Sequence, residues 1–155
     1  ETRQDVEPLA ELLLFAADRA QHVQHLIRPA LAAGRIVISD RYADATAAYQ
    51  GAGRGFDLEL IENVIAIATD GLKPDLTLFF DIDPDRAVDR MAFRGEHKMN
   101  RMDLESSDFY RRVREGYLKI AAADPARFRV IDANRSVDEI AEETLDLVTE
   151  HLKSV

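Results

Sequence analysis

Residues 76–82 of the 155-residue sequence are Leu-Thr-Leu-Phe-Phe-Asp-Ile, and the next two residues are Asp83 and Pro84. A short run of apolar, β-branched and aromatic residues is typical of a buried strand. An aspartate followed by a proline is a common start of a helix. This stretch therefore predicts a strand that leads directly into a helix.

Two further runs have the same character, Arg-Ile-Val-Ile-Ser-Asp at 35–40 and Arg-Phe-Arg-Val-Ile-Asp at 127–132. Between the runs, apolar residues recur at spacings of three and four, which predicts amphipathic helices. These helices are expected at 8–33, 57–69, 106–123 and 136–152. Asp57 should cap the second, Ser106 or Ser107 should start the third, and Ser136 and Glu139 should form a capping box at the start of the last. Pro29 should kink the first helix near residues 25–29. Strands that alternate with helices predict an α/β fold with a parallel sheet. Three strands are few for so much helix, so we expect part of the sheet to lie outside this sequence.

Composition and charge narrow the class of protein. Of the 155 residues, 46% are apolar, 32% are charged and none is cysteine. This composition predicts one globular domain over residues 1–155 and excludes disulfide frameworks and thiol nucleophiles. No apolar run approaches the roughly 18 residues of a membrane span, so we expect a soluble protein, and the absence of cysteine fits a reducing compartment such as the cytoplasm. The 20 basic and 29 acidic residues give a net charge of −9. That charge argues against non-specific binding to nucleic acid or membrane, so an anionic ligand requires a local group of basic side chains.

Asp40 and Arg41 stand at the end of the predicted strand at 35–40. In open parallel sheets, ligands bind beyond the carboxyl ends of the strands. A carboxylate at that place can hold Mg²⁺ or accept a proton, and the guanidinium beside it can bind a phosphate. An ion pair at the end of the strand is the alternative interpretation.

Phe15 and Arg19 lie four residues apart in the first predicted helix and therefore share a face, at the edge of its apolar stripe. An aromatic ring beside a forked donor can stack on a nucleotide base and hydrogen-bond to its carbonyl edge. The alternative is that Phe15 belongs to the core.

Two segments carry weaker signals. Gly51-Ala-Gly-Arg-Gly55 is rich in glycine, but no strand precedes it and no Gly-Lys-Ser/Thr ends it, so we predict a flexible turn rather than a phosphate loop. The stretch from Arg90 to Arg101 also contains Arg94 and Lys98 and lacks helical periodicity. It is either a loop that binds phosphates or a solvated surface loop.

Six segments, in this order, resemble those of the thymidylate kinases, the nucleoside monophosphate kinases that phosphorylate dTMP. They are Leu-Leu-Phe-Ala-Ala-Asp-Arg (13–19), Val-Ile-Ser-Asp-Arg-Tyr (37–42), Ala-Tyr-Gln-Gly-Ala-Gly-Arg-Gly (48–55), Lys-Pro-Asp-Leu-Thr-Leu (73–78), Phe-Tyr-Arg-Arg-Val-Arg-Glu-Gly-Tyr-Leu (109–118) and Val-Ile-Asp-Ala (130–133). The resemblance covers almost the whole chain beyond residue 8. It implies a P-loop NTPase fold, dTMP and ATP as substrates, Mg²⁺ as cofactor and a homodimer.

The resemblance also implies roles for single residues on the dTMP side. Phe15 would stack on thymine, and Arg19 would donate to a thymine carbonyl group. Thr46 and Gln50 would face the base, and Tyr49 would lie against the deoxyribose.

On the side of the reacting phosphates, the resemblance implies that Arg41 binds the dTMP phosphate and that Asp40 lies near Mg²⁺. The loop at 94–103 would be the lid over ATP, and Arg94 would stabilise the phosphoryl group during its transfer. The resemblance assigns Arg90, Arg94 and Arg101 to the lid, and it places adenine at Ala133 and Asn134.

The sequence departs from the family pattern in three places. Ala45 replaces a common serine, and Asn100 replaces a common aspartate. The third difference is larger, because members begin with a strand and a Gly-x-x-x-x-Gly-Lys-Ser/Thr loop that this sequence lacks. We therefore expect roughly 50 further residues before Glu1 in the complete enzyme, with that loop between a strand and a helix, and an inactive protein without them.

Two other functions stay open from the sequence. The first is another P-loop phosphotransferase such as a deoxynucleoside kinase, whose acceptor is a hydroxyl group and needs no phosphate contact from Arg41. The second is a truncated, non-catalytic module that binds a nucleotide. The missing phosphate loop favours the module, whereas the set of Phe15, Arg19, Asp40 and Arg41 argues against it.

Overall fold

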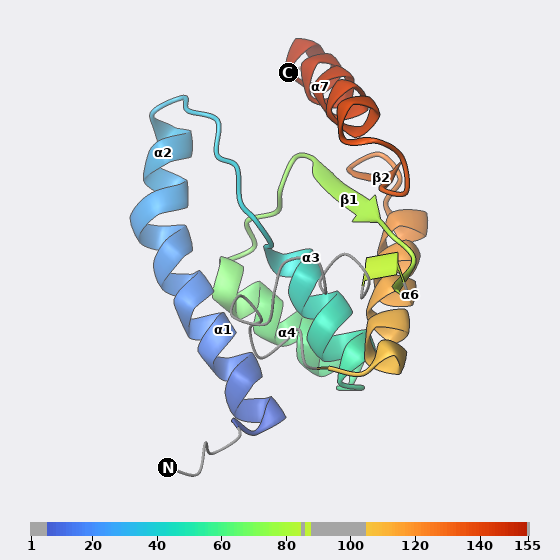
Figure 1. The fold of residues 1–155 in the computed structure, drawn as a ribbon. Helices are drawn as coiled ribbons and strands as arrows, with labels where there is room; N and C mark the ends of the chain where they lie inside the picture. The colour runs from blue at the N-terminus through green and yellow to red at the C-terminus, as the bar shows by residue number, and fades with distance from the viewer. Residues whose placement is uncertain (1–5, 85, 88–104, 155) are drawn as a thin grey trace, which may run out of the picture. The chain divides into compact units, whose positions relative to one another are not determined.

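The computed structural model describes residues 6–84, 86–87 and 105–154, and these form two compact units (Figure 1). One unit ends at Lys73 and the other starts at Pro74. The predicted lid at 94–103 lies outside the described residues. None of the described helices is long and apolar enough to cross a membrane.

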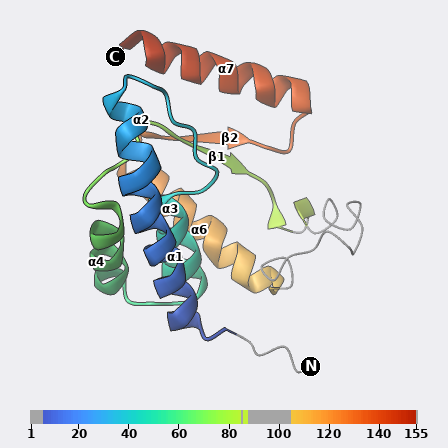
Figure 2. The same ribbon diagram turned by 90° about the vertical axis from the view of Figure 1, so that its left-hand side faces the viewer.

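The first unit begins with a long helical rod, which runs upward from α1 to α2 in Figure 2. It consists of α1 (Pro8–His22), the π-helical turn η1 (Val23–Ile27) and α2 (Arg28–Ala32). Pro29 has no N–H group to bond one turn back, and the π-helical turn lies immediately before it. The predicted interruption near 25–29 is therefore confirmed. Gly34, with a φ of 69°, follows the end of the rod.

The chain then turns into a second helical hairpin. It contains α3 (Ala43–Thr46), the π-helix η2 (Ala47–Gly53) and α4 (Leu58–Thr69). The predicted flexible turn at 51–55 is wrong for its first half, because Gly51 and Gly53 are helical and buried. A β-carbon at Gly51 would lie 3.8 Å from the side chain of Ile61. This is an ordinary van der Waals distance, so the packing of η2 on α4 would also admit an alanine at this position.

The predicted strand at 35–40 is wrong as well. Residues 35–39 carry no strand assignment, and the side chains of Ile36 and Ile38 are 69% and 94% exposed. A β-strand is stabilised by backbone hydrogen bonds to a neighbouring strand. No described residue forms such bonds with this segment, because the sheet contains only β1 and β2. High β-propensity alone does not produce a strand.

The second unit contains a two-stranded parallel sheet of β1 (Thr77–Asp81) and β2 (Phe128–Asp132). Thr77 is opposite Phe128 at one end of the ladder, and Asp81 is opposite Asp132 at the other. The predicted strands at 76–82 and 127–132 and their parallel pairing are confirmed.

Helices α6 (Ser107–Ala123) and α7 (Val137–Ser154) flank these strands (Figure 2). The Phe79 ring stacks on Tyr117 of α6 with ring centres 4.5 Å apart, and Ile131 of β2 is fully buried. Ser106 caps α6, since its hydroxyl accepts from the backbone N–H of Phe109 at 3.2 Å. The sheet and the two helices together carry the core of this unit.

Candidate active site

Six side chains from two helical segments of the first unit define what we call the α1–η2 cluster. Glu11, Phe15 and Arg19 follow one another at intervals of four along α1, so they share one face. On the other segment, the members also recur at intervals of four. These members are Thr46, Gln50 and Arg54.

Arg19 lies at one end of the cluster and is fixed from two sides. Its Nη1 donates to Oγ1 of Thr46 at 2.5 Å, and its guanidinium lies 5.5 Å from the centre of the Tyr42 ring. The Tyr42 hydroxyl donates to the Leu72 carbonyl at 3.2 Å, and burial raises its pKa, an effect that the positive charge of Arg19 partly offsets. A fixed guanidinium can present its remaining N–H groups to a carbonyl oxygen in a defined direction.

Glu11 lies at the other end of the cluster, where it is almost completely buried. Its Oε1 accepts a hydrogen bond from Nε2 of Gln50 at 3.3 Å. Nε and Nη2 of Arg54 also donate to this oxygen, each at 3.4 Å. A buried carboxylate is tolerated only when it is paired, and Arg54 supplies the countercharge.

Phe15 lies on α1 between Glu11 and Arg19, with one polar link on each side of it. Its side chain is 44% exposed, so the ring is not part of the core and a flat ligand can reach it. The sequence-based alternative of a core phenylalanine is wrong. The cluster therefore combines an accessible aromatic ring with hydrogen-bonding groups directed from α1, α3 and η2.

Arg41 has a left-handed backbone conformation, with a φ of 68°, which is rare for a residue other than glycine. Ser39 Oγ donates to the Arg41 carbonyl oxygen at 2.9 Å, and the guanidinium lies 4.9 Å from the centre of the Tyr49 ring. The side chain of Asp40 is exposed, and Asp40 forms no ion pair with a described residue. The alternative of a simple ion pair between these neighbours is thus not observed. Strain of this kind is concentrated at functional sites.

In the second unit, the residues after β2 form a compact turn that we call the β2–α7 junction, residues 132–139. The N–H of Ala133 donates to the Asp81 carbonyl at 2.8 Å, and both N–H groups of Asn134, backbone and side chain, donate to Oδ1 of Asp132 at 2.9 and 2.7 Å. These bonds, that of the Asn134 backbone first, lower the pKa of Asp132. The predicted adenine position, Ala133 and Asn134, therefore has a defined backbone conformation.

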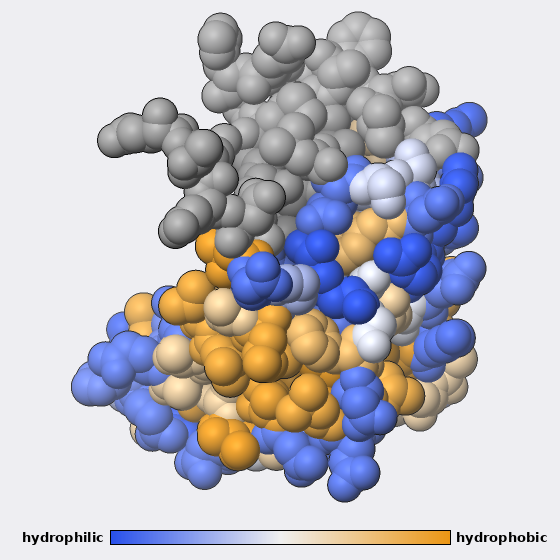
Figure 3. Space-filling model, turned by 90° about the horizontal axis from the view of Figure 1, so that it is seen from below, coloured by the Kyte–Doolittle hydropathy of each residue, from blue (hydrophilic) through white to orange (hydrophobic). Residues whose placement is uncertain are grey.

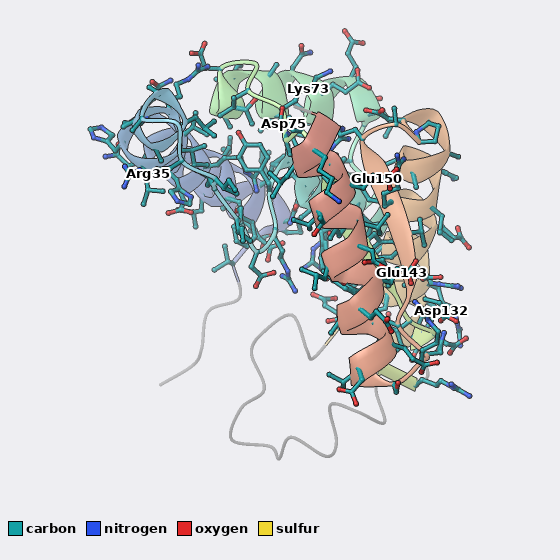
Figure 4. All side chains as sticks on the ribbon, turned by 90° about the horizontal axis from the view of Figure 1, so that it is seen from above. Arg35, Lys73, Asp75, Asp132, Glu143 and Glu150 are labelled. Carbon is teal, nitrogen blue, oxygen red and sulfur yellow. The ribbon has the colours of Figure 1, made fainter. Side chains whose placement is uncertain are left out.

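The start of α7 is joined to this junction by further polar contacts. Arg135 bonds to the Asp132 carbonyl at 3.2 Å and to the carboxylate of Glu143, which Figure 4 shows projecting from α7. Ser136 and Glu139 form a reciprocal capping box, in which the Ser136 N–H donates to Glu139 at 3.0 Å and the Glu139 N–H donates to Ser136 at 3.3 Å. The capping box predicted from the sequence is confirmed.

Asp81 and Arg114 form a bidentate pair at the carboxyl end of β1, with distances of 2.5 and 2.7 Å. The hydrogen bond to Asp81 raises the pKa of the Arg114 guanidinium. Sequence analysis missed this pair, although Asp81, like Asp40, ends an apolar run. It also missed Glu11 and Arg54, because nothing local to α1 marks Glu11 as buried.

The remaining predicted residues cannot be placed. Arg90, Arg94 and Arg101 lie outside the described residues. Within the described ranges, no group of three or more histidine and acidic residues could hold a metal ion by itself. Asp40 is the one predicted metal contact that the structure describes, and it is a single exposed carboxylate.

Comparison with known proteins gives consistent results. The family model described as "Thymidylate kinase" matches residues 1–144. The thymidylate kinase of Solidesulfovibrio magneticus is 53% identical over 86% of this chain and 66% of its own length. That of Deinococcus radiodurans is 47% identical over 94% of this chain and 70% of its own length.

A solved structure is also similar. The thymidylate kinase from Ehrlichia chaffeensis is 33% identical with a TM-score of 0.71, over 95% of this chain and 67% of that chain. This similarity confirms the predicted α/β, P-loop type of fold. The chain spans about two thirds of the length of the relatives that it matches.

Proposed function

Because the chain belongs to the thymidylate kinase family, we propose that the whole protein transfers the γ-phosphoryl group of ATP to dTMP. An oxygen of the dTMP phosphate attacks the γ-phosphorus, the bond to the bridging oxygen breaks, and dTDP and ADP form. The observation that carries this proposal is the α1–η2 cluster together with the strained Arg41. It supplies a ring, hydrogen-bonding groups and a phosphate-binding cation from one unit of the chain.

The base is bound by the cluster in this proposal. Thymine stacks on the accessible ring of Phe15, and such stacking is worth about 1–3 kcal/mol. Arg19, fixed by Thr46 and Tyr42, donates to a carbonyl oxygen of the base. Gln50 faces the edge of the base, and Tyr49 lies against the deoxyribose.

The phosphate of dTMP is bound by Arg41. Its guanidinium lies over the Tyr49 ring, and its unusual backbone conformation fixes where the side chain starts. Since Tyr49 contacts Arg41, the group proposed for the sugar also orients the group proposed for the phosphate. Positioning of this kind is the main contribution that a protein makes to phosphoryl transfer.

The Asp40 carboxylate is the group that we propose as the contact of the chain with Mg²⁺. Magnesium keeps most of its water and is usually bound by one or two carboxylates plus substrate phosphates, so a single exposed carboxylate is a suitable contact. When bound, the ion offsets negative charge on the phosphates. The chain's own part is to present Asp40 directly before Arg41.

ATP is bound by residues of the second unit in this proposal. We assign adenine to Ala133 and Asn134, where the β2–α7 junction has a defined backbone. Arg90, Arg94 and Arg101 keep their predicted role over the phosphates of ATP, with Arg94 acting on the group in transfer. The cytoplasm is the compartment proposed for this reaction.

We also propose that the protein is a homodimer that associates through the first unit. Figure 3 shows hydrophobic side chains gathered in one area of the molecular surface. Exposed leucines and isoleucines occur on α1 and α4, which contact each other. They are Leu9, Leu13, Leu14, Leu58, Leu60 and Ile67. Exposed apolar side chains that gather in this way are typical of an interface.

The test compares dTMP with thymidine as acceptors in the full-length protein, with ATP and Mg²⁺. We expect dTDP to form and thymidine to remain unchanged, because Arg41 requires a phosphate on the acceptor. Phosphorylation of thymidine in place of dTMP would favour the deoxynucleoside kinase. Binding of dTMP without turnover would favour the non-catalytic module.

A further inference from the structure

The Tyr42 ring contacts the arginine that the proposed function assigns to the base. The guanidinium of Arg19 lies over this ring, 5.5 Å from its centre, which is within the range of a cation–π contact. A planar guanidinium stacked on a ring keeps its N–H groups in a fixed direction. Thr46 accepts a hydrogen bond from the same guanidinium at 2.5 Å, so Arg19 is held from two directions.

The Tyr42 ring is itself tethered at its far end. Its hydroxyl group donates to the carbonyl oxygen of Leu72, just beyond the end of α4, at 3.2 Å. Burial raises the pKa of this hydroxyl by more than the charges of Arg19 and Arg28 lower it, so the group remains a protonated donor at neutral pH. Because the hydroxyl is held, the ring presents a constant face to Arg19.

Tyr42 also anchors the short segment of backbone that carries Arg41. The φ of Arg41 is 68°, a conformation that a residue other than glycine keeps only where its surroundings enforce it. On one side, Ser39 Oγ donates to the Arg41 carbonyl oxygen at 2.9 Å. On the other side, the Tyr42 carbonyl oxygen accepts from the backbone N–H of Ala45 at 3.2 Å, at the start of α3. The point from which the Arg41 side chain starts therefore depends on where Tyr42 is anchored.

We propose that Tyr42 is a positioning residue that couples the base contact of Arg19 to the phosphate contact of Arg41, and this inference rests on the proposed function. Its ring orients the first guanidinium, and its anchored backbone fixes the origin of the second. A nucleotide with both a base and a phosphate then meets two cations whose spacing is set before it binds. Such preorganisation lowers the entropic cost of binding and keeps the acceptor phosphate in one place.

The test uses Tyr42→Leu in the full-length protein, because leucine offers neither a π face nor a hydroxyl group. Dissociation constants of thymidine, dTMP and ATP are measured by isothermal titration. Thymidine should bind about 2- to 30-fold more weakly, the effect of losing a cation–π contact. The ratio of dTMP to thymidine affinity reports the phosphate contact and should fall by about fivefold or more, the size of a weak coupling between two sites. ATP should bind unchanged.

Tyr42→Phe is the conservative variant. It keeps a ring over Arg19 and should recover most of the thymidine affinity that Tyr42→Leu loses. If it recovered none, the ring would not be the group that orients Arg19, and the proposal would fail. Tyr117→Leu is the matched control, since it removes a ring that stacks on Phe79 in the second unit. It should lower the free energy of unfolding and leave the ratio of dTMP to thymidine affinity unchanged.

Arg19→Met covers the case in which Tyr42→Leu does not fold, because it removes only the guanidinium from a half-buried position on α1. Coupling between two sites is reciprocal, so this substitution should also lower the ratio of dTMP to thymidine affinity. An unchanged ratio in either folded variant would overturn the proposal. Equal weakening of dTMP, thymidine and ATP in Tyr42→Leu would also overturn it and give Tyr42 a purely structural role. Failure of the wild type to bind dTMP would instead contradict the proposed function.

Discussion

The α1–η2 cluster and the β2–α7 junction use polar side chains in different ways. In the cluster, hydrogen bonds join residues 27 to 43 positions apart, and Glu11, Thr46 and Gln50 are buried. At the junction, the bonds of Asn134 to Asp132 and of Ser136 to Glu139 span two or three positions, and these residues are exposed.

The difference predicts where substitutions will matter. A buried polar group that loses its partner keeps the full penalty of having left water, whereas an exposed group regains water as a partner. The cluster also depends on hydrogen bonds that join α1 to α3 and η2, whereas the side-chain bonds of Asp132 and Glu139 close within a few residues. We therefore expect large and selective effects in the cluster and small ones at the junction.

The largest effect is expected for Arg54→Ala, which removes the guanidinium that pairs with the buried carboxylate of Glu11. Removing one partner of a buried pair typically costs about 3 kcal/mol or more of unfolding free energy. Urea unfolding of the full-length protein measures it. Arg111→Ala is the control, because the Arg111–Asp108 pair is exposed on α6 and should contribute less than about 0.5 kcal/mol. If both variants lost a similar amount of unfolding free energy, the predicted difference between buried and exposed ion pairs would be wrong.

Phe15→Ala comes next and should act on binding rather than on folding. Loss of stacking should weaken dTMP binding about 5- to 150-fold and leave ATP binding nearly unchanged. Phe80→Ala is the matched control, since Phe80 on β1 is 46% exposed and Phe15 is 44% exposed. Titration of each variant with both nucleotides gives the four constants. If Phe15→Ala weakened both nucleotides equally, the ring would be structural and the assignment of the base would fail.

A smaller effect is expected for Ser136→Ala at the junction. The substitution removes the cap of α7 and should lower the unfolding free energy by about 1 kcal/mol. Affinity for dTMP should not change, because the cap serves only the helix that it begins. Thermal unfolding and dTMP titration of the same sample test both statements. A loss of unfolding free energy above about 3 kcal/mol would show that Ser136 stabilises more than the first turn of α7.

The smallest effect concerns pH at the same junction. Hydrogen bonds from Asn134 lower the pKa of Asp132, and those from Ser136 lower the pKa of Glu139. A carboxyl group whose folded pKa is depressed stabilises the folded state above its unfolded pKa, near 4, and this stabilisation is lost as the pH falls further. Hydrogen exchange at the first turn of α7 should therefore speed up below about pH 4 before the core of β1 and β2 is affected. Uniform exchange across the unit would contradict this order.

Helix boundaries could be predicted from the sequence because their signals are local. Asp57 accepts from the backbone N–H of Leu60 at 3.1 Å, as its place before an apolar pattern suggested. Ser106 and the Ser136–Glu139 box behave in the same way. Pro29 likewise predicted the interruption of the first helical rod. Each signal needs only the residues of one turn.

Features that depend on distant partners could not be predicted. The runs at 35–40 and 127–132 have similar β-branched character, yet among the described residues only the second forms a strand pair, with β1. The helix at 43–53 was missed because its glycines suggested a turn, whereas Gly51 and Gly53 are buried within η2. For the site, the spacing of Phe15 and Arg19 was informative, but the link to Thr46 and the burial of Glu11 arise from tertiary packing alone.

The most direct test of the account is a crystal structure of the full-length protein with dTMP bound. We predict the thymine ring on Phe15, one of its carbonyl oxygens on Arg19, and the phosphate on Arg41. A nucleotide bound away from the α1–η2 cluster, or one whose base leaves Phe15 and Gln50 untouched, would contradict the assignment of this cluster as the acceptor site.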